Sequence, residues 1–247
     1  MRLLIDIGNS RLKWSWQAEK RHGPIDAIAY EIDSLPNVLP VLWLEERRPQ
    51  DIWVASVAGP EVNHVLDHLL SSQWGISAHY IKASHSALGV TNAYTDPEQL
   101  GCDRWAALLA TYHLEKTCVM VVDCGSAVTI DAVDSQGHHL GGTISPGISL
   151  SNTVLNQHTN LNWHENESAL PDNVFAITTA DAIMAGIGHG IIGLIEHAYQ
   201  QLADAGHHPV LYLTGGDAPY ISKALHIEHK HVEDLVLEGL ALLADHA

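Results

Sequence analysis

One pattern occurs twice in this chain and restricts its fold more than any other feature. An apolar run leads to an acidic residue, a turn containing glycine follows, and a second strand-like run comes next. The first copy is Arg2–Ile7, which carries Asp6, and the second is Cys118–Val122, which leads to Asp123. Short apolar runs bounded by turn residues are typical of buried strands. The repeat therefore predicts two similar halves, each beginning with a hairpin.

The rest of each half alternates between strand-like and helical segments, which is typical of an α/β protein. We expect one α/β half over residues 1–115, a second over residues 116–247, and a ligand cleft between them. Further strands are expected over 12–16, 25–32, 51–57, 128–133, 138–145 and 211–214, helices over 38–48, 61–73, 147–157, 178–204, 233–245 and from about Asp103, and a surface excursion over 161–173.

Charge and composition narrow the classes of function. Lys and Arg total 12 and Asp and Glu total 29, so the net charge of the 247 residues is −17 with neutral histidine. A protein that holds nucleic acid by neutralising phosphates needs the opposite sign, so nucleic-acid binding is not expected.

No apolar run reaches the roughly 18 residues of a membrane helix. The N-terminal run is too short for a signal peptide, and three cysteines without CxxC spacing favour the cytoplasm.

The two acidic turns have a chemical interpretation. A carboxylate beside turn amides suits a polyphosphate bound with a metal cation, because the amides face phosphate oxygens while the acid holds the cation. A single acid before a glycine is also ordinary in hairpins, but two related turns favour one polyphosphate ligand. Lys13 is expected to reach a phosphate or to be a solvated lysine. The double glycine Gly215-Gly216 would admit adenosine or form a plain strand-to-helix turn.

The segment from Tyr94 to Trp105 carries the residues expected to act on a substrate. Asp103 lies at a predicted helix start, where an acid is commonly an N-cap. With Arg104 beside it a second role is open, in which the carboxylate accepts a hydroxyl proton and the guanidinium holds an anionic substrate. Phosphoryl transfer to an alcohol needs such a pair, because that reaction depends on positioning and charge neutralisation.

A group of histidines near residue 230 has two interpretations. His229 and His231 share a face if their segment is a strand, so together with His226 they form a conceivable metal site. The nearby acids Glu228 and Glu233 make a solvated polar edge the more natural interpretation, because no fourth ligand is identifiable.

Taken together, four motifs resemble those of type III pantothenate kinases. They occur in the family's order, and the likeness extends over the whole chain. The motifs are Asp6-Ile7-Gly8-Asn9-Ser10-Arg11-Leu12-Lys13, the segment with Tyr94, Pro97 and Leu100-Gly101-Cys102-Asp103-Arg104, the run Asp123-Cys124-Gly125-Ser126-Ala127-Val128-Thr129-Ile130-Asp131, and Gly141-Gly142-Thr143-Ile144-Ser145-Pro146-Gly147.

The resemblance implies a fold, a reaction and partners. The fold is of the actin and sugar-kinase type, with two ribonuclease-H-like halves and a nucleotide cleft between them. The reaction is ATP-dependent phosphorylation of pantothenate to 4'-phosphopantothenate, the first step of coenzyme A biosynthesis. The implied cofactors are Mg²⁺ and a monovalent cation, K⁺ or NH₄⁺. The family also implies a homodimer whose active site is completed across the interface.

Roles for individual residues are implied by the same resemblance. Asp103 is the implied general base for the pantothenate hydroxyl, Asp6 an implied Mg²⁺ ligand, and Asp123 the implied ligand of the monovalent cation. The implied ATP-binding residues are Asp6, Ile7, Gly8, Asn9, Ser10, Arg11, Leu12, Lys13 and Ser126, and the implied pantothenate-binding residues are Tyr94, Gly101, Cys102, Asp103, Arg104 and Thr179.

Two other functions stay open at this point. A regulatory or accessory protein of the same fold would bind nucleotide without transferring phosphate, and a related kinase would act on another small alcohol. A pure binding protein has no need of a base, so the presence together of Asp6, Asp103, Arg104 and Asp123 speaks against it. The segment from Tyr94 to Arg104 favours pantothenate over a sugar.

Overall fold

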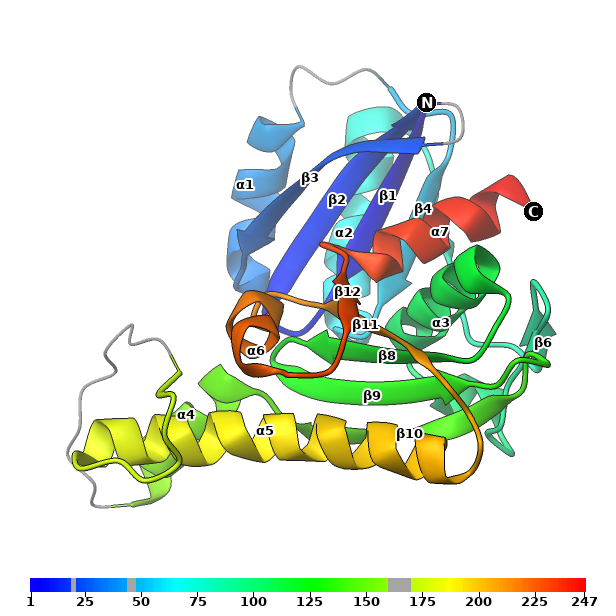
Figure 1. Cartoon of the computed structure of the whole chain (residues 1–247). Coiled ribbons are helices and arrows are strands. Elements are labelled where there is room, and N and C mark those ends of the chain that lie inside the picture. The colour runs from blue at the N-terminus through cyan, green and yellow to red at the C-terminus, as the bar shows by residue number, and fades with distance from the viewer. Residues whose placement is uncertain (19–20, 44–47, 160–169) are drawn as a thin grey trace. The chain divides into compact units, whose positions relative to one another are not determined.

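A computed structural model shows that the chain forms two compact units, and each is built on one mixed five-stranded sheet (Figure 1). The structure describes residues 1–18, 21–43, 48–159 and 170–247. Within these ranges no helix is long and apolar enough to cross a membrane. The first unit consists of Met1–Ala87, Tyr94–Ala110 and Leu235–Ala247, and the second of Leu88–Ala93 and Thr111–Asp234.

The sheet of the first unit has the strand order β3-β2-β1-β4-β5. Its first three strands are antiparallel neighbours joined by short connections, whereas β4 and β5 run parallel to β1 and follow helical crossovers. The elements are β1 (Arg2–Ile7), β2 (Arg11–Ala18), β3 (Arg21–Ala29), η1 (Ile32–Ser34), α1 (Leu35–Leu42), β4 (Ile52–Ser56), α2 (Pro60–Trp74), β5 (His79–Tyr80), β6 (Ser86–Ala87), η2 (Pro97–Gln99), residues 102–110 of α3 (Cys102–Glu115), and α7 (Leu235–Asp245).

The sheet of the second unit has the order β10-β9-β8-β11-β12, with β8, β9 and β10 antiparallel and β11 and β12 parallel to β8. The predicted α/β fold of two similar halves is thereby confirmed, because both units repeat one strand order and one set of strand directions. The elements are β7 (Val90–Thr91), the end of α3, β8 (Val119–Cys124), β9 (Ala127–Val133), β10 (His139–Pro146), α4 (Ile148–His158), α5 (Thr179–Asp204), β11 (Val210–Thr214), α6 (Ala218–Ala224) and β12 (His229–His231).

Side chains of β1 alternate between the two faces of the first sheet. Leu3, Ile5 and Ile7 belong to the apolar core that includes residues of α1 and α2. Leu4 belongs to a second core formed with residues of α3 and α7. Because successive strand residues point to opposite faces, Asp6 shares the face of Leu4. The sequence of β1 thus directs Asp6 toward the face that α3 covers.

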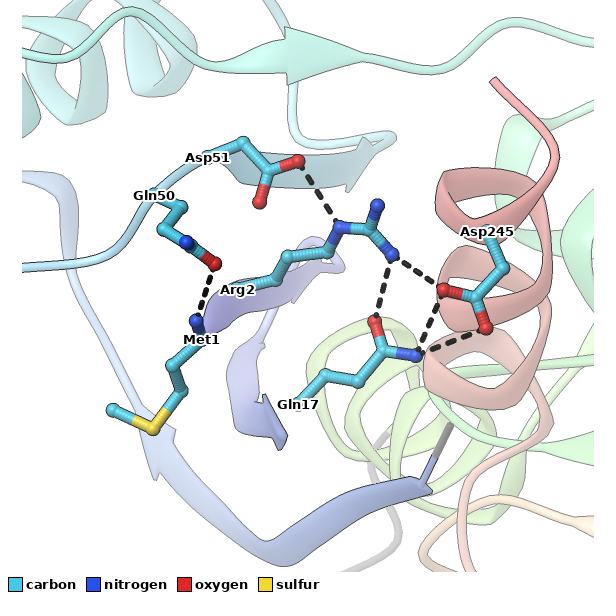
Figure 2. A pocket seen from close by; sticks show the side chains of 6 residues that line it. All are labelled: Met1, Arg2, Gln17, Gln50, Asp51 and Asp245. Atoms are coloured by element: carbon cyan, nitrogen blue, oxygen red, sulfur yellow. Dashed lines mark hydrogen bonds and ion pairs between the residues drawn. The ribbon is translucent and has the colours of Figure 1, made fainter. Parts of the chain in front are cut away.

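The helix α7 packs with the first unit although it follows the second unit in sequence. Its apolar residues share a buried core with Leu4 and Ala106, and Gly239 lies so close to the Ala106 backbone that an added Cβ would overlap it. Arg2 adds a polar attachment, because its Nη1 lies 2.5 Å from Asp245 Oδ1 and its Nε 3.0 Å from Asp51 Oδ2 (Figure 2). The two compact units are defined by packing and do not test the predicted domains over residues 1–115 and 116–247. That division of the chain stays a prediction.

Two predicted elements have different bounds in the structure. The helix expected over 38–48 is α1, which ends at Leu42 because Trp43 leaves helical geometry at φ −102° and ψ 6°. The strand expected over 25–32 is β3, which includes Pro24 and ends at Ala29. Pro24 is tolerated because β3 lies at an edge of the sheet. Residues 160–169, most of the predicted surface excursion, lie outside the described residues.

Candidate active site

The first acidic turn closes the hairpin between β1 and β2. Asp6 stands opposite Lys13 in the antiparallel register, so both side chains lie on one face of the sheet. Asp6 is buried, and the Lys13 Nζ lies 3.7 Å from its Oδ2. Asn9, Ser10 and Arg11 are exposed at the tip. The turn therefore combines a buried carboxylate, a nearby ammonium group and exposed polar residues.

The carbonyl oxygens of this turn accept hydrogen bonds from the protein. The Gly8 N–H donates to the Arg11 carbonyl at 3.0 Å, and the Tyr30 N–H donates to the Ser10 carbonyl at 3.4 Å. The Tyr30 hydroxyl donates to the Gly8 carbonyl at 2.8 Å. Sequence reasoning missed Tyr30. The available signal was the hairpin register, because Arg11 pairs with Ala29 and so brings the next residue beside Ser10.

Asp103 is the second residue of α3, as the sequence predicted. Its Oδ1 accepts a hydrogen bond from the Arg104 N–H at 2.8 Å, which satisfies one of the backbone donors at the helix start. Gly101 lies so close that an added Cβ would overlap this carboxylate oxygen. Capping does not exclude a catalytic role, because each oxygen of a carboxylate can accept more than one hydrogen bond.

Arg104 is buried and braced by an aromatic ring. Its Nη1 donates to the Tyr94 hydroxyl at 3.2 Å, and its guanidinium carbon lies 5.9 Å from the centre of the Tyr94 ring. Holding the guanidinium in one orientation prepares it to bind a carboxylate through two parallel hydrogen bonds. The structure thus brings together the predicted substrate residues Tyr94, Asp103 and Arg104.

Cys102 links this group to the first acidic turn. Its thiol is buried and donates to the Ser56 carbonyl at 3.4 Å. Burial raises the pKa of Cys102 to about 11, and the negative charges of Asp103 and Asp6 add to the rise. The charges of both carboxylates act on the same thiol, so Asp6 and Asp103 belong to one region of the first unit. The thiol is protonated at neutral pH and is a poor nucleophile.

The second acidic turn joins β8 and β9 in the second unit. Asp123 stands next to the end of β8, as Asp6 does in β1, and Ser126 is exposed in the turn. Gly147 lies against this turn so closely that an added Cβ would overlap the Gly125 carbonyl. Gly147, the last residue of the fourth motif, therefore packs on the turn of the third motif.

The double-glycine turn after β11 lies beside Asp123. Gly215 has φ +94°, and a Cβ added there would overlap Asp123 Oδ1 and the Cys124 carbonyl. The Asp217 N–H donates to the same Cys124 carbonyl at 2.9 Å. Burial raises the pKa of Cys124 to about 12, with Asp123 and Asp217 adding to the rise. Asp217 is thus a second acidic residue beside this turn, and sequence reasoning gave it no role.

A buried hydrogen-bonded pair, His139 and Asp131, holds the segment that precedes Tyr94. The His139 Nε2 lies 3.1 Å from Asp131 Oδ1, and the Ala93 N–H donates to His139 Nδ1 at 3.5 Å. Both side chains are almost fully inaccessible to solvent. With Nδ1 accepting, Nε2 carries the proton that the carboxylate binds. This pair fixes the backbone one residue before Tyr94, and sequence reasoning assigned no role to either side chain.

Thr179 and the histidines lie in the second unit. Thr179 is the exposed first residue of α5. His229 Nδ1 lies 2.6 Å from the Ile227 carbonyl, and its Nε2 lies 2.7 Å from Ser222 Oγ, so both ring nitrogens have protein partners. Among the described residues, no group of three or more His, Cys, Asp and Glu side chains is arranged to hold a metal ion.

A cavity of about 510 Å³ lies at the opposite end of β1 (Figure 2). Arg2 begins β1 and Asp6 is four residues further along, which corresponds to roughly 13 Å of strand. Asp51 and Asp245 line the cavity and are paired with Arg2. This distance along the strand separates the cavity from the acidic turn.

Comparison with known proteins decides the family. The family model of type III pantothenate kinase matches residues 2–201. A type III pantothenate kinase from Nitrosococcus oceani is 35% identical over 250 residues, which cover 99% of this chain and 94% of the relative. This chain belongs to the type III pantothenate kinase family. The resemblance inferred from the four motifs is confirmed.

Solved structures show that the fold extends beyond type III pantothenate kinases. A conserved protein from Campylobacter jejuni, assigned to the Baf family of transcriptional activators, is 24% identical, with a TM-score of 0.59 and coverage of 99% of this chain and 98% of that chain. A protein from Sinorhizobium meliloti described as a 2-dehydro-3-deoxygalactonokinase is 13% identical, with a TM-score of 0.60 and coverage of 100% and 99%. These likenesses concern the fold, which is the predicted sugar-kinase type.

Proposed function

We propose that this chain transfers the γ-phosphoryl group of ATP to the primary hydroxyl of pantothenate and forms 4'-phosphopantothenate and ADP. The observation that carries the proposal is the group of Tyr94, Asp103 and Arg104 at the start of α3, in a chain matched over 99% of its length by a type III pantothenate kinase. We place the reaction in the cytoplasm, a location supported by three cysteines that are all free thiols.

The residues at the start of α3 supply a base and an anion site. The pantothenate hydroxyl oxygen attacks the γ-phosphorus, the bond between that phosphorus and the ADP oxygen breaks, and Asp103 accepts the hydroxyl proton. Arg104 pairs with the pantothenate carboxylate, and Tyr94 keeps the guanidinium in place. Gly101 and Cys102 directly precede Asp103 and Arg104, and we assign their backbone to the same pantothenate site.

The first acidic turn is suited to the phosphates of ATP. Residues from Asp6 to Lys13 supply a carboxylate, turn amides, polar side chains and an ammonium group in one hairpin. Asp6 fits Mg²⁺, because proteins commonly hold that ion through one or two carboxylates together with substrate phosphates. When bound, Mg²⁺ neutralises charge that develops on the phosphates. Lys13 Nζ, now 3.7 Å from Asp6, is close enough to the turn to bind a phosphate oxygen.

The second acidic turn is suited to a monovalent cation and to ATP. Asp123 Oδ1 is held against Gly215 and near the Cys124 carbonyl, so oxygen ligands of the kind that hard cations prefer gather there. Ser126 is exposed in the same turn, a position that is compatible with a contact to ATP. We therefore assign K⁺ or NH₄⁺ to Asp123 and a nucleotide contact to Ser126.

The test is ADP release from ATP and Mg²⁺, measured with and without pantothenate in sodium, potassium and ammonium salts. We expect release that requires pantothenate and rises with K⁺ or NH₄⁺. Release that requires pantothenate but is equal in all three salts would keep the kinase and remove the cation from Asp123. Release that does not respond to pantothenate would favour another small alcohol, or a binding protein if no ADP forms.

We also propose a homodimer formed by the second unit. Large apolar side chains are exposed on β10, on α4 and in the segment before α5, where the exposed fraction of Phe175 is 87%. Large apolar side chains left exposed in one part of a chain are of the kind that protein interfaces cover. Thr179 is two residues beyond this segment, which agrees with its implied place near an interface. The exposed residues are Ile144, Leu150, Val154, Val174, Phe175 and Ile177.

Replacing Phe175 and Ile177 by aspartate is expected to convert the dimer to a monomer and to lower activity at least tenfold, because charges at an apolar interface are left without partners. Sedimentation velocity and pantothenate-dependent ADP release measure the two effects. Leu114→Asp is the matched control, since Leu114 is an exposed apolar residue on α3. A wild-type chain that is fully active as a monomer would contradict the shared site.

A further inference from the structure

Tyr30 makes two hydrogen bonds to the first acidic turn from outside it. Its hydroxyl binds the Gly8 carbonyl and its backbone N–H binds the Ser10 carbonyl. Its ring packs against the apolar core of the first unit, which fixes the side chain from the other side. Burial raises the pKa of Tyr30, so the hydroxyl is protonated and able to donate at neutral pH.

The two hydrogen bonds from Tyr30 fix the direction in which the Gly8 and Ser10 carbonyl groups of the turn point. The Ile7, Gly8, Ser10 and Arg11 carbonyls all accept hydrogen bonds from protein groups, and the bond to Gly8 is the one that a side chain supplies. A carbonyl oxygen carries partial negative charge and repels phosphate oxygens, whereas an amide N–H attracts them. A turn whose carbonyls face the protein therefore presents a less negative outer surface to a polyphosphate.

We propose that Tyr30 is a positioning residue for nucleotide binding, which holds the Gly8 carbonyl away from the phosphates of ATP. The inference rests on the proposed function of the turn as the phosphate site and adds a residue that none of the motifs contains. Tyr30 itself does not touch the reacting atoms. It acts through the Gly8 carbonyl, and its loss changes nucleotide binding and leaves the chemical step alone.

The test compares Tyr30→Phe with Tyr80→Phe. Both replacements keep the ring and remove one hydroxyl from the first unit, but the Tyr80 hydroxyl binds Asp67 and the Asn63 carbonyl instead of the turn. For Tyr30→Phe we expect the KM for ATP and the Kd for ADP to rise about three- to tenfold, as the loss of one hydrogen bond predicts. The kcat and the KM for pantothenate should change less than twofold. Tyr80→Phe should leave all four constants unchanged.

A second readout does not depend on turnover. Amide hydrogen exchange of residues 8–11, measured without ligand, should accelerate in Tyr30→Phe and not in Tyr80→Phe. Unchanged exchange, or an unchanged KM for ATP, would overturn the role of Tyr30. Ser10→Ala separates this result from failure of the phosphate site, because Ser10 is exposed at the turn. If Ser10→Ala raises the KM for ATP and Tyr30→Phe does not, the turn binds ATP without help from Tyr30; if neither raises it, the turn is not the phosphate site.

Discussion

Replacing Asp103 by asparagine is expected to lower kcat by a factor of about 10²–10⁴ while ATP binding stays nearly intact. An amide cannot accept the proton of the pantothenate hydroxyl at neutral pH. Its oxygen can still accept the hydrogen bond from the Arg104 N–H that the Asp103 Oδ1 accepts at 2.8 Å, so the start of α3 is preserved. Steady-state kinetics and calorimetric titration with ADP measure the two quantities.

The matched control for this prediction is Asp96→Asn. Asp96 also caps a helical turn, because its carboxylate accepts the Glu98 N–H at 3.3 Å, and it lies in the same segment as Asp103. We expect this control to retain kcat within a factor of about two, as is usual for an exposed surface replacement. An Asp103→Asn enzyme with normal kcat would show that the proton leaves by another route.

Replacing Gly215 by alanine is expected to destabilise the second unit by about 2–4 kcal/mol. One part of this cost is the positive φ of +94°, and the other is overlap of the new Cβ with Asp123 Oδ1 and the Cys124 carbonyl. Relief of the overlap has to move Asp123, so the K⁺ or NH₄⁺ concentration required for half-maximal activity should also rise. Urea unfolding and a cation titration of activity measure these effects.

Gly206→Ala separates the two parts of that cost. Gly206 has a similar φ of +84°, but an added Cβ there would meet no atom within 4 Å. We expect its loss of stability to be about 1–2 kcal/mol and its cation dependence to be unchanged. If Gly215→Ala and Gly206→Ala change the cation dependence equally, the overlap between the new Cβ and Asp123 is not the cause of the change.

The repeated pattern of a strand, an acid and a glycine turn was enough to predict the two α/β halves. Apolar alternation in β1 also determines that Asp6 lies on the face of Leu4, because one strand can place neighbouring residues only on opposite faces. The start of α3 at Cys102 and Asp103 was predictable for a similar reason, since helix starts are encoded locally by polar residues before an apolar face.

Residues that act through tertiary contacts were not predictable in this way. The Tyr30 hydroxyl binds the Gly8 carbonyl, which is 22 residues earlier in the sequence. His139 of β10 binds Asp131 of β9 and the backbone of Ala93, so this contact joins three separate segments. Each of these residues is compatible with many environments when its local sequence alone is considered. Asp217 was missed because its relation to Asp123 depends on the parallel pairing of β11 with β8, which no local pattern specifies.

The packing of α7 affects the order in which the molecule can be completed during translation. All residues of the second unit precede Leu235, so they have left the ribosome before α7 is available. The core around Leu4 and Ala106 needs α7, and the ion pair between Arg2 and Asp245 spans 243 positions. Contacts this distant in sequence form slowly. The half that is synthesised first can therefore be completed only after the whole of the second half has been synthesised.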